Sequence, residues 1–174
     1  MNAIVLTDQR WAIGLDGGPL FSLEADRKRS GELTEGGTVI VGHRNLGCFP
    51  GDQPLPGRRN IIITPNAELK IDGCEIALNP EAALEMAGGP DAENVWILGG
   101  GSVYAVLLSR CRRVYRIQVD AKVESPDTWF PNLDKLANWR LDFASEPFQE
   151  GKYTYRFNSR RSGWPLNRFK VRTA

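Results

Sequence analysis

The stretch Val95-Trp96-Ile97-Leu98-Gly99-Gly100-Gly101-Ser102-Val103-Tyr104 decides the predicted fold. Its apolar start predicts a buried strand, and the spacing of Val103, Val106 and Leu107 predicts a helix over Ser102–Leu108. The glycines between them let the backbone approach a ligand closely. The free N–H groups that open the helix favour a phosphate, although the spacing is not the GxGxxG of a Rossmann site. A tight turn without a ligand is the alternative.

Strand and helix patterns alternate on both sides of this stretch. Apolar runs rich in β-branched residues predict strands at Ala3–Thr7, Thr38–Val41, Asn60–Thr64, Glu75–Leu78, Asn94–Leu98 and Val114–Val119. Further helices are predicted at Leu23–Ser30 and Pro80–Ala87. Near the end, Trp139–Ser145 and Tyr153–Asn158 alternate in polarity and predict an antiparallel hairpin. This order predicts an α/β domain with a mostly parallel sheet and an antiparallel edge.

Length and composition fit one globular domain. The chain has 174 residues, of which 41% are hydrophobic and 25% charged, and its formal net charge of +1 gives no basic field for nucleic acid. The apolar run Ala3–Leu6 is too short for a signal peptide or a membrane span, so we expect a cytoplasmic protein. We expect residues 1–160 to form the domain and the basic residues 161–174 to form a tail without an assigned function.

Cysteine and histidine usage argues against several chemistries. Cys48, Cys74 and Cys111 are scattered and odd in number, which favours three reduced thiols. The single histidine, His43, and the absence of a CxxC pair leave too few ligands for a zinc site, so no metal is expected. A Ser-His-Asp mechanism would depend on His43 alone as its base.

A second glycine-ended strand carries cationic groups. Thr38–Asn45 runs as a strand into Gly42 and continues with His43 and Arg44. Ligands of open α/β sheets bind beyond the carboxyl ends of the strands, so two such strand ends would share one dinucleotide. Arg44, with His43, would face a phosphate, which favours NADP over NAD. A solvated loop arginine is the alternative.

Two more segments carry charges suited to a small ligand. Pro54–Asn60 is a stiff turn that would fix the direction of Arg58, and a fixed guanidinium suits a carboxylate. A rigid connection with solvated arginines explains the turn equally well. Asp26 would lie in the first turn of a short helix, where most aspartates are surface caps.

Taken together and in this order, the segments resemble the dihydrofolate reductase family from about Asn2 to Phe157. The motifs that carry the resemblance are Trp11–Gly14, Leu23–Asp26, Val39–Arg44, Pro54–Asn60, Ile97–Tyr104 and Asp127–Pro131. The glycine run with its tyrosine, the proline-glycine-arginine turn and the Asp-Thr-x-Phe-Pro string are each fairly specific. The resemblance implies one domain with a central eight-stranded, mostly parallel sheet, an antiparallel C-terminal edge and about four flanking helices.

The resemblance also implies an activity, the reduction of 7,8-dihydrofolate to tetrahydrofolate by NADPH, with hydride added at C6 and a proton at N5. Asp26 would be the catalytic group and would hydrogen-bond the N3 and 2-amino edge of the pterin. Arg58 would hold the α-carboxylate of the glutamate tail. Gly99 and Gly100 would be joined by a cis peptide bond, and residues 14–21 would form a mobile lid over the nicotinamide.

The resemblance also implies full sets of cofactor and substrate contacts. The cofactor contacts would be Leu6, Ile13, Gly14, Gly42, His43, Arg44, Asn45, Ile63, Thr64, Leu98, Gly99, Gly100, Gly101, Ser102, Val103, Tyr104 and Thr128. The substrate contacts would be Ile4, Val5, Phe21, Asp26, Arg27, Ser30, Phe49, Arg58, Tyr104 and Ile117.

The chain departs from the family pattern around the pterin pocket. Pro19-Leu20-Phe21 stands where Leu-Pro-Trp is usual, which removes a water-anchoring indole N–H. The basic run Arg27–Ser30 follows Asp26, so Ser30 would face the pocket where an aromatic ring is usual. Ile117 replaces a supporting hydroxyl, and Asn45 replaces a common threonine. The basic run would attract anionic polyglutamylated folates or form a solvated helix face.

Three functions stay open at this stage: a dihydrofolate reductase, a related NADPH reductase such as the pyrimidine reductase of riboflavin synthesis, and a non-catalytic nucleotide-binding module. The second acts on a ribityl phosphate, so Asp26 and the Pro-Gly-Arg turn argue against it. The altered substrate wall is the only support for the third. We expect a monomer that binds a small-molecule substrate and has no nucleic-acid or membrane partner.

Overall fold

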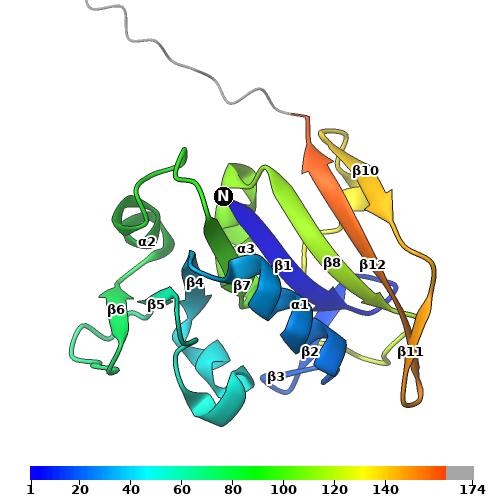
Figure 1. The fold of residues 1–174 in the computed structure, drawn as a ribbon, viewed down its shortest axis with the longest axis horizontal. Coiled ribbons are helices and arrows are strands. Elements are labelled where there is room, and N and C mark those ends of the chain that lie inside the picture. Colours follow the sequence, from blue (N-terminus) through cyan, green and yellow to red (C-terminus); the bar gives the residue numbers. More distant parts are fainter. Residues whose placement is uncertain (164–174) are drawn as a thin grey trace, which may run out of the picture.

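A large sheet runs through the molecule in the order β10-β12-β8-β1-β7-β4-β5-β6, and the short strand β11 also pairs with β12 (Figure 1). The computed structural model describes residues 1–163, without the side chains of Cys48 and Pro50. The strands of this sheet are β1 (Asn2–Thr7), β4 (Thr38–Gly42), β5 (Arg59–Ile63), β6 (Cys74–Ala77), β7 (Val95–Gly99), β8 (Arg113–Val119), β10 (Trp139–Ala144), β11 (Phe148–Glu150) and β12 (Tyr153–Ser162). The pairs from β8 through β6 are parallel, whereas β12 is antiparallel to β8, β10 and β11.

The central strands are buried on both faces. Val39, Ile40 and Val41 are consecutive in β4, and none of the three is accessible to solvent. Alternate residues of one strand point to opposite faces, so a continuous apolar run needs a cover on each side. The predicted α/β sheet with its antiparallel C-terminal edge is therefore confirmed.

Helices pack on both faces of the sheet. Leu33 of α1 (Glu24–Thr34) packs with Ile4 and Val39 on one face. On the other face, α2 (Pro80–Met86) and α3 (Gly101–Leu107) pack with Ile40 and Ile97. About four helices were expected, and the described residues form three α-helices together with the 3-10 turns η1 (His43–Cys48), η2 (Pro50–Asp52), η3 (Leu108–Arg110) and η4 (Leu133–Lys135).

Two elements extend beyond their predicted ends. Helix α1 continues to Thr34, whose hydroxyl donates to the carbonyl oxygen of Ser30 at 2.7 Å. Strand β12 continues to Ser162, because its last residues pair with both β8 and β10. The strand thus includes the first two residues of the expected basic tail, and residues 164–174 lie outside the described residues.

A second, smaller sheet was not foreseen. It joins β3 (Gly18–Pro19), β2 (Ala12–Leu15) and β9 (Thr128–Trp129) in that order. Asp127 strengthens this contact, since its backbone N–H donates to Gly14 O at 3.1 Å and its carboxylate accepts from Asp16 N at 2.7 Å. The segment expected to form a lid is therefore paired with the loop that follows β8.

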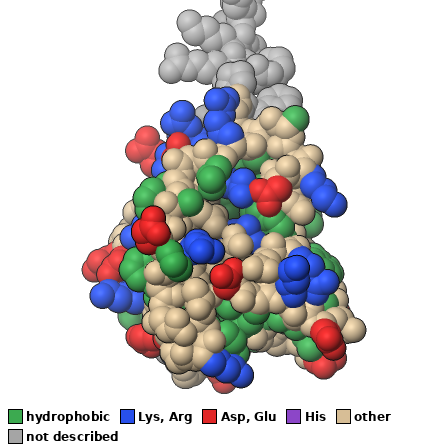
Figure 2. Space-filling model, turned by 90° about the vertical axis from the view of Figure 1, so that its right-hand side faces the viewer, with side chains coloured by type: hydrophobic (Ala, Val, Ile, Leu, Met, Phe, Trp, Pro, Cys, Tyr) green, Lys and Arg blue, Asp and Glu red, His purple; other side chains and the backbone are tan. Residues whose placement is uncertain are grey.

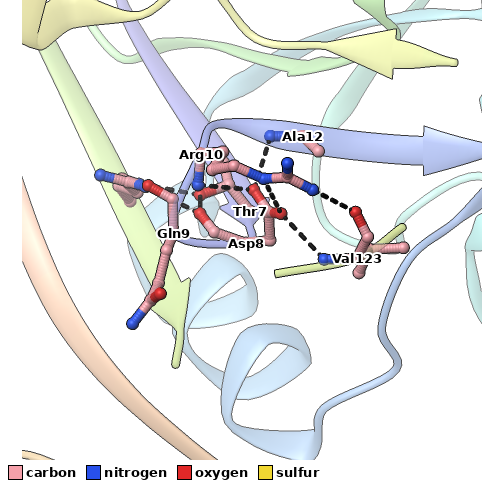
Figure 3. Close-up of polar contacts among 7 residues, drawn as sticks. Thr7, Asp8, Gln9, Arg10, Ala12 and Val123 are labelled. Carbon is pink, nitrogen blue, oxygen red and sulfur yellow. Dashed lines mark hydrogen bonds and ion pairs between the residues drawn. The ribbon is translucent and has the colours of Figure 1, made fainter. Parts of the chain in front are cut away.

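Asp8, at the end of β1, fixes the base of this lid segment (Figure 3). Its side chain is fully buried, and Oδ1 accepts from the backbone N–H groups of Arg10 at 2.8 Å and Ala12 at 2.9 Å. Its Oδ2 accepts from the N–H of Val123 at 3.2 Å, and the guanidinium of Arg10 donates to the carbonyl of Val123. One carboxylate thus joins the start of β2 to the loop after β8.

The variant Asp8→Ala should therefore lower the free energy of unfolding by about 2–3 kcal/mol, because three N–H donors lose a charged acceptor. Asp8→Asn is the matched control, since its amide oxygen still accepts from one side, and it should lose less. Urea denaturation at neutral pH measures both. Equal losses in the two variants would contradict this account of Asp8.

Candidate active site

The two glycine-ended strands lie side by side. Val41 of β4 pairs with Gly99 of β7, and a Cβ placed on Gly42 would lie 3.6 Å from the nitrogen of Gly100. The Gly99–Gly100 peptide bond is cis, as the resemblance implies, and Gly99 has a φ of +119°. The predicted meeting of two strand ends at one edge of the sheet is confirmed.

Side chains from two other elements occupy the space beside the glycines. A Cβ on Gly100 would lie 2.6 Å from Oδ1 of Asn45, which belongs to η1. A Cβ on Gly101 would lie 2.7 Å from Cγ2 of Thr128 in β9. A methyl group at either position would therefore force Asn45 or Thr128 to move, so both side chains pack closely because glycine is present.

Cationic and polar groups line the neighbouring strand ends. His43 and Arg44 follow β4 with exposed side chains, and Arg44 has no hydrogen bond or ion pair with any described residue. Nδ1 of His43 lies 3.4 Å from the carbonyl oxygen of Ile63, the last residue of β5. Thr64 follows, buried, with its hydroxyl accepting from the N–H of Asn66 at 3.2 Å. This edge has the groups to hold a dinucleotide phosphate.

Tyr104 connects α3 to the central strand. Its buried hydroxyl donates to the carbonyl oxygen of Ile4, and its ring meets Phe130 edge-on at 4.8 Å. Phe130 in turn stacks on Trp11 at 5.8 Å. The aromatic contacts thus reach from the glycine turn to the base of the lid segment.

Asp26 is a half-buried carboxyl in the first turn of α1. No described residue forms a hydrogen bond or a close ion pair with it. Burial raises the pKa of Asp26 from 3.8 to about 6, against the opposing charge of Arg27. Arg27 itself turns outward, where its guanidinium lies 3.0 Å from both Glu24 Oε2 and Ser22 Oγ. The carboxyl is therefore poised to change its protonation state near neutral pH.

The start of α1 is held by a residue that sequence reasoning missed. Leu23 at the N-cap offers no side-chain acceptor, and Glu150 of β11 accepts from the N–H groups of Glu24 at 2.6 Å and Ala25 at 3.0 Å instead. The N–H groups of Ala25 and Glu24 lower the pKa of Glu150. A cap supplied from more than a hundred residues away leaves no local signal in the sequence.

Arg58 closes the other end of the same helix. Its Nε donates to the hydroxyl of Thr34 at 3.2 Å, Nη1 donates to Pro56 O at 2.5 Å, and Nη2 donates to the carbonyl of Gly31. Its direction is fixed, as the stiff turn predicts. Arg59 points elsewhere and pairs with Glu75.

The remaining expected substrate contacts divide between the two faces of the sheet. Ile4 and Ile117 are buried on the face that α1 covers, and Phe21 packs in the cluster around Ile117. Val5 follows Ile4 in the same strand, so its side chain packs in the core on the opposite face. Further expected contacts, Ser30 and Phe49, are half-buried.

Within residues 1–163, no three His, Cys, Asp or Glu side chains gather in a way that would hold a metal ion. Among the described helices, none is long and apolar enough to cross a membrane.

A sequence model of a known family, described as dihydrofolate reductase, matches residues 1–161, so the chain is an α/β oxidoreductase. It belongs to the dihydrofolate reductase family. The dihydrofolate reductase type 3 of Salmonella typhimurium is 34% identical over 135 residues, which are 78% of this chain and 80% of that protein. A dihydrofolate reductase of Mycobacterium tuberculosis is 31% identical over 150 residues, covering 84% and 88%. That of Staphylococcus haemolyticus is 29% identical, covering 89% and 90%.

The raised pKa of Asp26 predicts that the acid lowers stability at neutral pH. Between its usual pKa of 3.8 and about 6 the folded protein binds more protons than the unfolded chain, so the free energy of unfolding falls as pH rises. Asp26→Asn should therefore be more stable than the parent at pH 7.5, by on the order of 2 kcal/mol, and equally stable near pH 3. Glu32→Gln, on the exposed side of α1, is the control. A less stable Asp26→Asn at pH 7.5 would refute the assignment.

Proposed function

We propose that this protein reduces 7,8-dihydrofolate to 5,6,7,8-tetrahydrofolate, with NADPH as the hydride donor. The observation that carries the proposal is Asp26, a half-buried acid without a partner among the described residues and with a pKa of about 6. Leu33 of the same helix packs with Leu98 and Ile4, so α1 lies against strands that end at the glycine turn. When bound there, NADPH supplies the hydride that reaches C6 of the pterin.

Asp26 binds the pterin and promotes its protonation. Its carboxyl hydrogen-bonds the N3 and 2-amino groups of the pterin and promotes protonation at N5. A pKa near the working pH lets one group both hold and release a proton, which is the condition for effective general acid catalysis. Ile117 and Phe21 belong to the apolar cluster that includes Ala25, the residue before Asp26.

Arg58 holds the far end of the substrate. A guanidinium has five N–H donors, and Arg58 directs one from each of its three nitrogens to Thr34, Pro56 and Gly31. The two remaining N–H groups suit the α-carboxylate of a glutamate tail. The protein chain thus fixes the distance between Asp26, which binds the pterin edge, and Arg58, which binds the tail.

The cofactor side is proposed on the glycine turn and the strand ends beside it. Gly99–Gly101 permit close approach of the dinucleotide backbone, and Arg44, with His43, provides positive charge for the phosphate that distinguishes NADPH from NADH. The segment Gly14–Phe21, tied to β9, is proposed as the lid that excludes water. We propose a monomeric, cytoplasmic enzyme, consistent with the free thiols of Cys74 and Cys111.

Mixing the protein with NADPH and dihydrofolate should lower the absorbance of the reduced nicotinamide. In single turnovers, the hydride-transfer rate should fall as pH rises through about 6, because Asp26 loses its proton there. Asp26→Asn should remove this step from the pH profile and lower the rate at pH 7 by about 100-fold or more. NADPH binding without any turnover at high enzyme concentration would instead favour a non-catalytic nucleotide-binding module.

Arg44→Ala should raise the KM for NADPH by about 10-fold to 100-fold, since a charge-assisted hydrogen bond contributes about 1.5–3 kcal/mol. The KM for NADH should change little, because that cofactor lacks the additional phosphate. Lys122→Ala, an exposed cation elsewhere, is the matched control. Equal effects of Arg44→Ala on both cofactors would exclude Arg44 from phosphate recognition.

A further inference from the structure

A cavity of about 260 Å³ lies between α1 and the C-terminal side of the sheet. Its floor includes one row of strand partners, in which Ile4 pairs with Tyr115, Tyr115 with Ser159, and Ser159 with Phe143. Phe157 stands beside this row. Neither Asp26 nor Arg58 nor any glycine of the 99–101 turn lines the cavity, so it is separate from the proposed catalytic groups.

Ser159 makes the hollow and leaves a polar group in it. It is the smallest side chain of the row, between the rings of Tyr115 and Phe143. The residue is only 4% exposed, and no hydrogen bond of its hydroxyl to another residue from 1 to 163 is present. The hydroxyl oxygen is not among the fully buried unpaired atoms, so it is accessible from the cavity and free to donate to a polar atom of a ligand.

Arg29 supplies a positive charge at the same cavity. It projects from α1, and its guanidinium carbon lies 5.7 Å from the centre of the Phe157 ring. Arg113, a second cation of the lining, is neutralised by Asp142 at 3.0 Å. Arg29 has no acidic partner among the described side chains, so its charge is available to an anion.

The mouth of the cavity is aromatic and open to solvent. Phe143, a residue of the lining, is 55% exposed. Phe148 lies outside the lining, is 47% exposed, and meets the Phe157 ring of the lining edge-on at 5.5 Å. Figure 2 shows a face of the molecule on which arginine or lysine side chains lie among hydrophobic ones around a hollow. An exposed ring next to the Arg29 guanidinium suits a flat, negatively charged molecule.

We propose that this cavity binds a small planar aromatic carboxylate. The carboxylate pairs with the guanidinium of Arg29, the ring packs among Tyr115, Phe143 and Phe157, and the hydroxyl of Ser159 donates to a ligand oxygen. The volume accommodates one or two fused rings. The site is an addition to the proposed reductase function and does not depend on it.

Isothermal titration of the full chain with naphthalene-2-carboxylate tests the proposal. The neutral probe naphthalene-2-carboxamide should bind at least about tenfold more weakly, because it lacks the charge that pairs with Arg29. Arg29→Met should weaken carboxylate binding by a similar factor. Lys28→Met is the matched control, since it removes the preceding cation of the same helix from an exposed position, and it should bind as the parent does.

Further variants separate the possible outcomes. Ser159→Ala should weaken binding by a smaller factor, about threefold to tenfold, and Arg29→Lys should retain part of the affinity.

Ile4 and Ile117 also belong to the expected substrate contacts, so Arg58→Met reports whether the probe enters the proposed substrate site instead. Loss of binding in Arg58→Met but not in Arg29→Met would overturn the proposal. Equal affinity for carboxylate and amide, or no binding at millimolar concentration, would overturn it as well. The titration needs neither NADPH nor dihydrofolate, so its failure is distinct from a failure of the reductase assay.

Discussion

Burial of both faces of the central parallel strands is the constraint on which the rest of this structure depends. Strands β1, β7, β4 and β5 leave no face to water, so charged groups have room only at strand ends or on the covering helices. Arg44 lies just after the end of a strand, and Asp26 lies on a covering helix. The expected cofactor contacts at the strand ends and the acid on α1 therefore come from different elements of the fold.

Helix α1 is held in place from outside. It is rich in charged residues and has little apolar face of its own. Its sequence alone therefore gives only a weak tendency to pack as a helix at this position. Glu150 satisfies N–H groups at its start, and Arg58 satisfies a carbonyl near its end. Both partners come from other elements of the fold. Asp26 therefore owes its position, and the burial that raises its pKa, to tertiary contacts more than to local propensity.

The sequence predicted features that depend on neighbouring residues and missed features that depend on residues far apart in the chain. Apolar runs and glycine turns are local signals, and they predicted the longer strands, the antiparallel pairing of β10 with β12 and the meeting of Gly42 with Gly99. Strand β11 was not predicted, because Gln149 and Glu150 were expected to lie between the two strands of a hairpin. The second sheet escaped prediction because β3 and β9 have two residues each and no apolar run. Asp8 and Glu150 escaped because a carboxylate that accepts distant N–H groups looks like any surface acid in a sequence. Val5 stays a predicted substrate contact, and its side chain packs in the core on the face opposite Ile4.

The bonds of Arg58 to the end of α1 have a consequence for how this chain can diverge. Asp26 lies in the first turn of the helix, and Arg58 is anchored to Gly31 and Thr34 near its end. Insertion or deletion of one residue between them would rotate one group against the other by about 100°. The outward-facing charged residues of α1 can be substituted during evolution. The number of residues between Asp26 and the residues that bind Arg58 cannot change without turning the two groups apart. Homologous chains should therefore vary widely in the composition of this helix and hardly at all in its length.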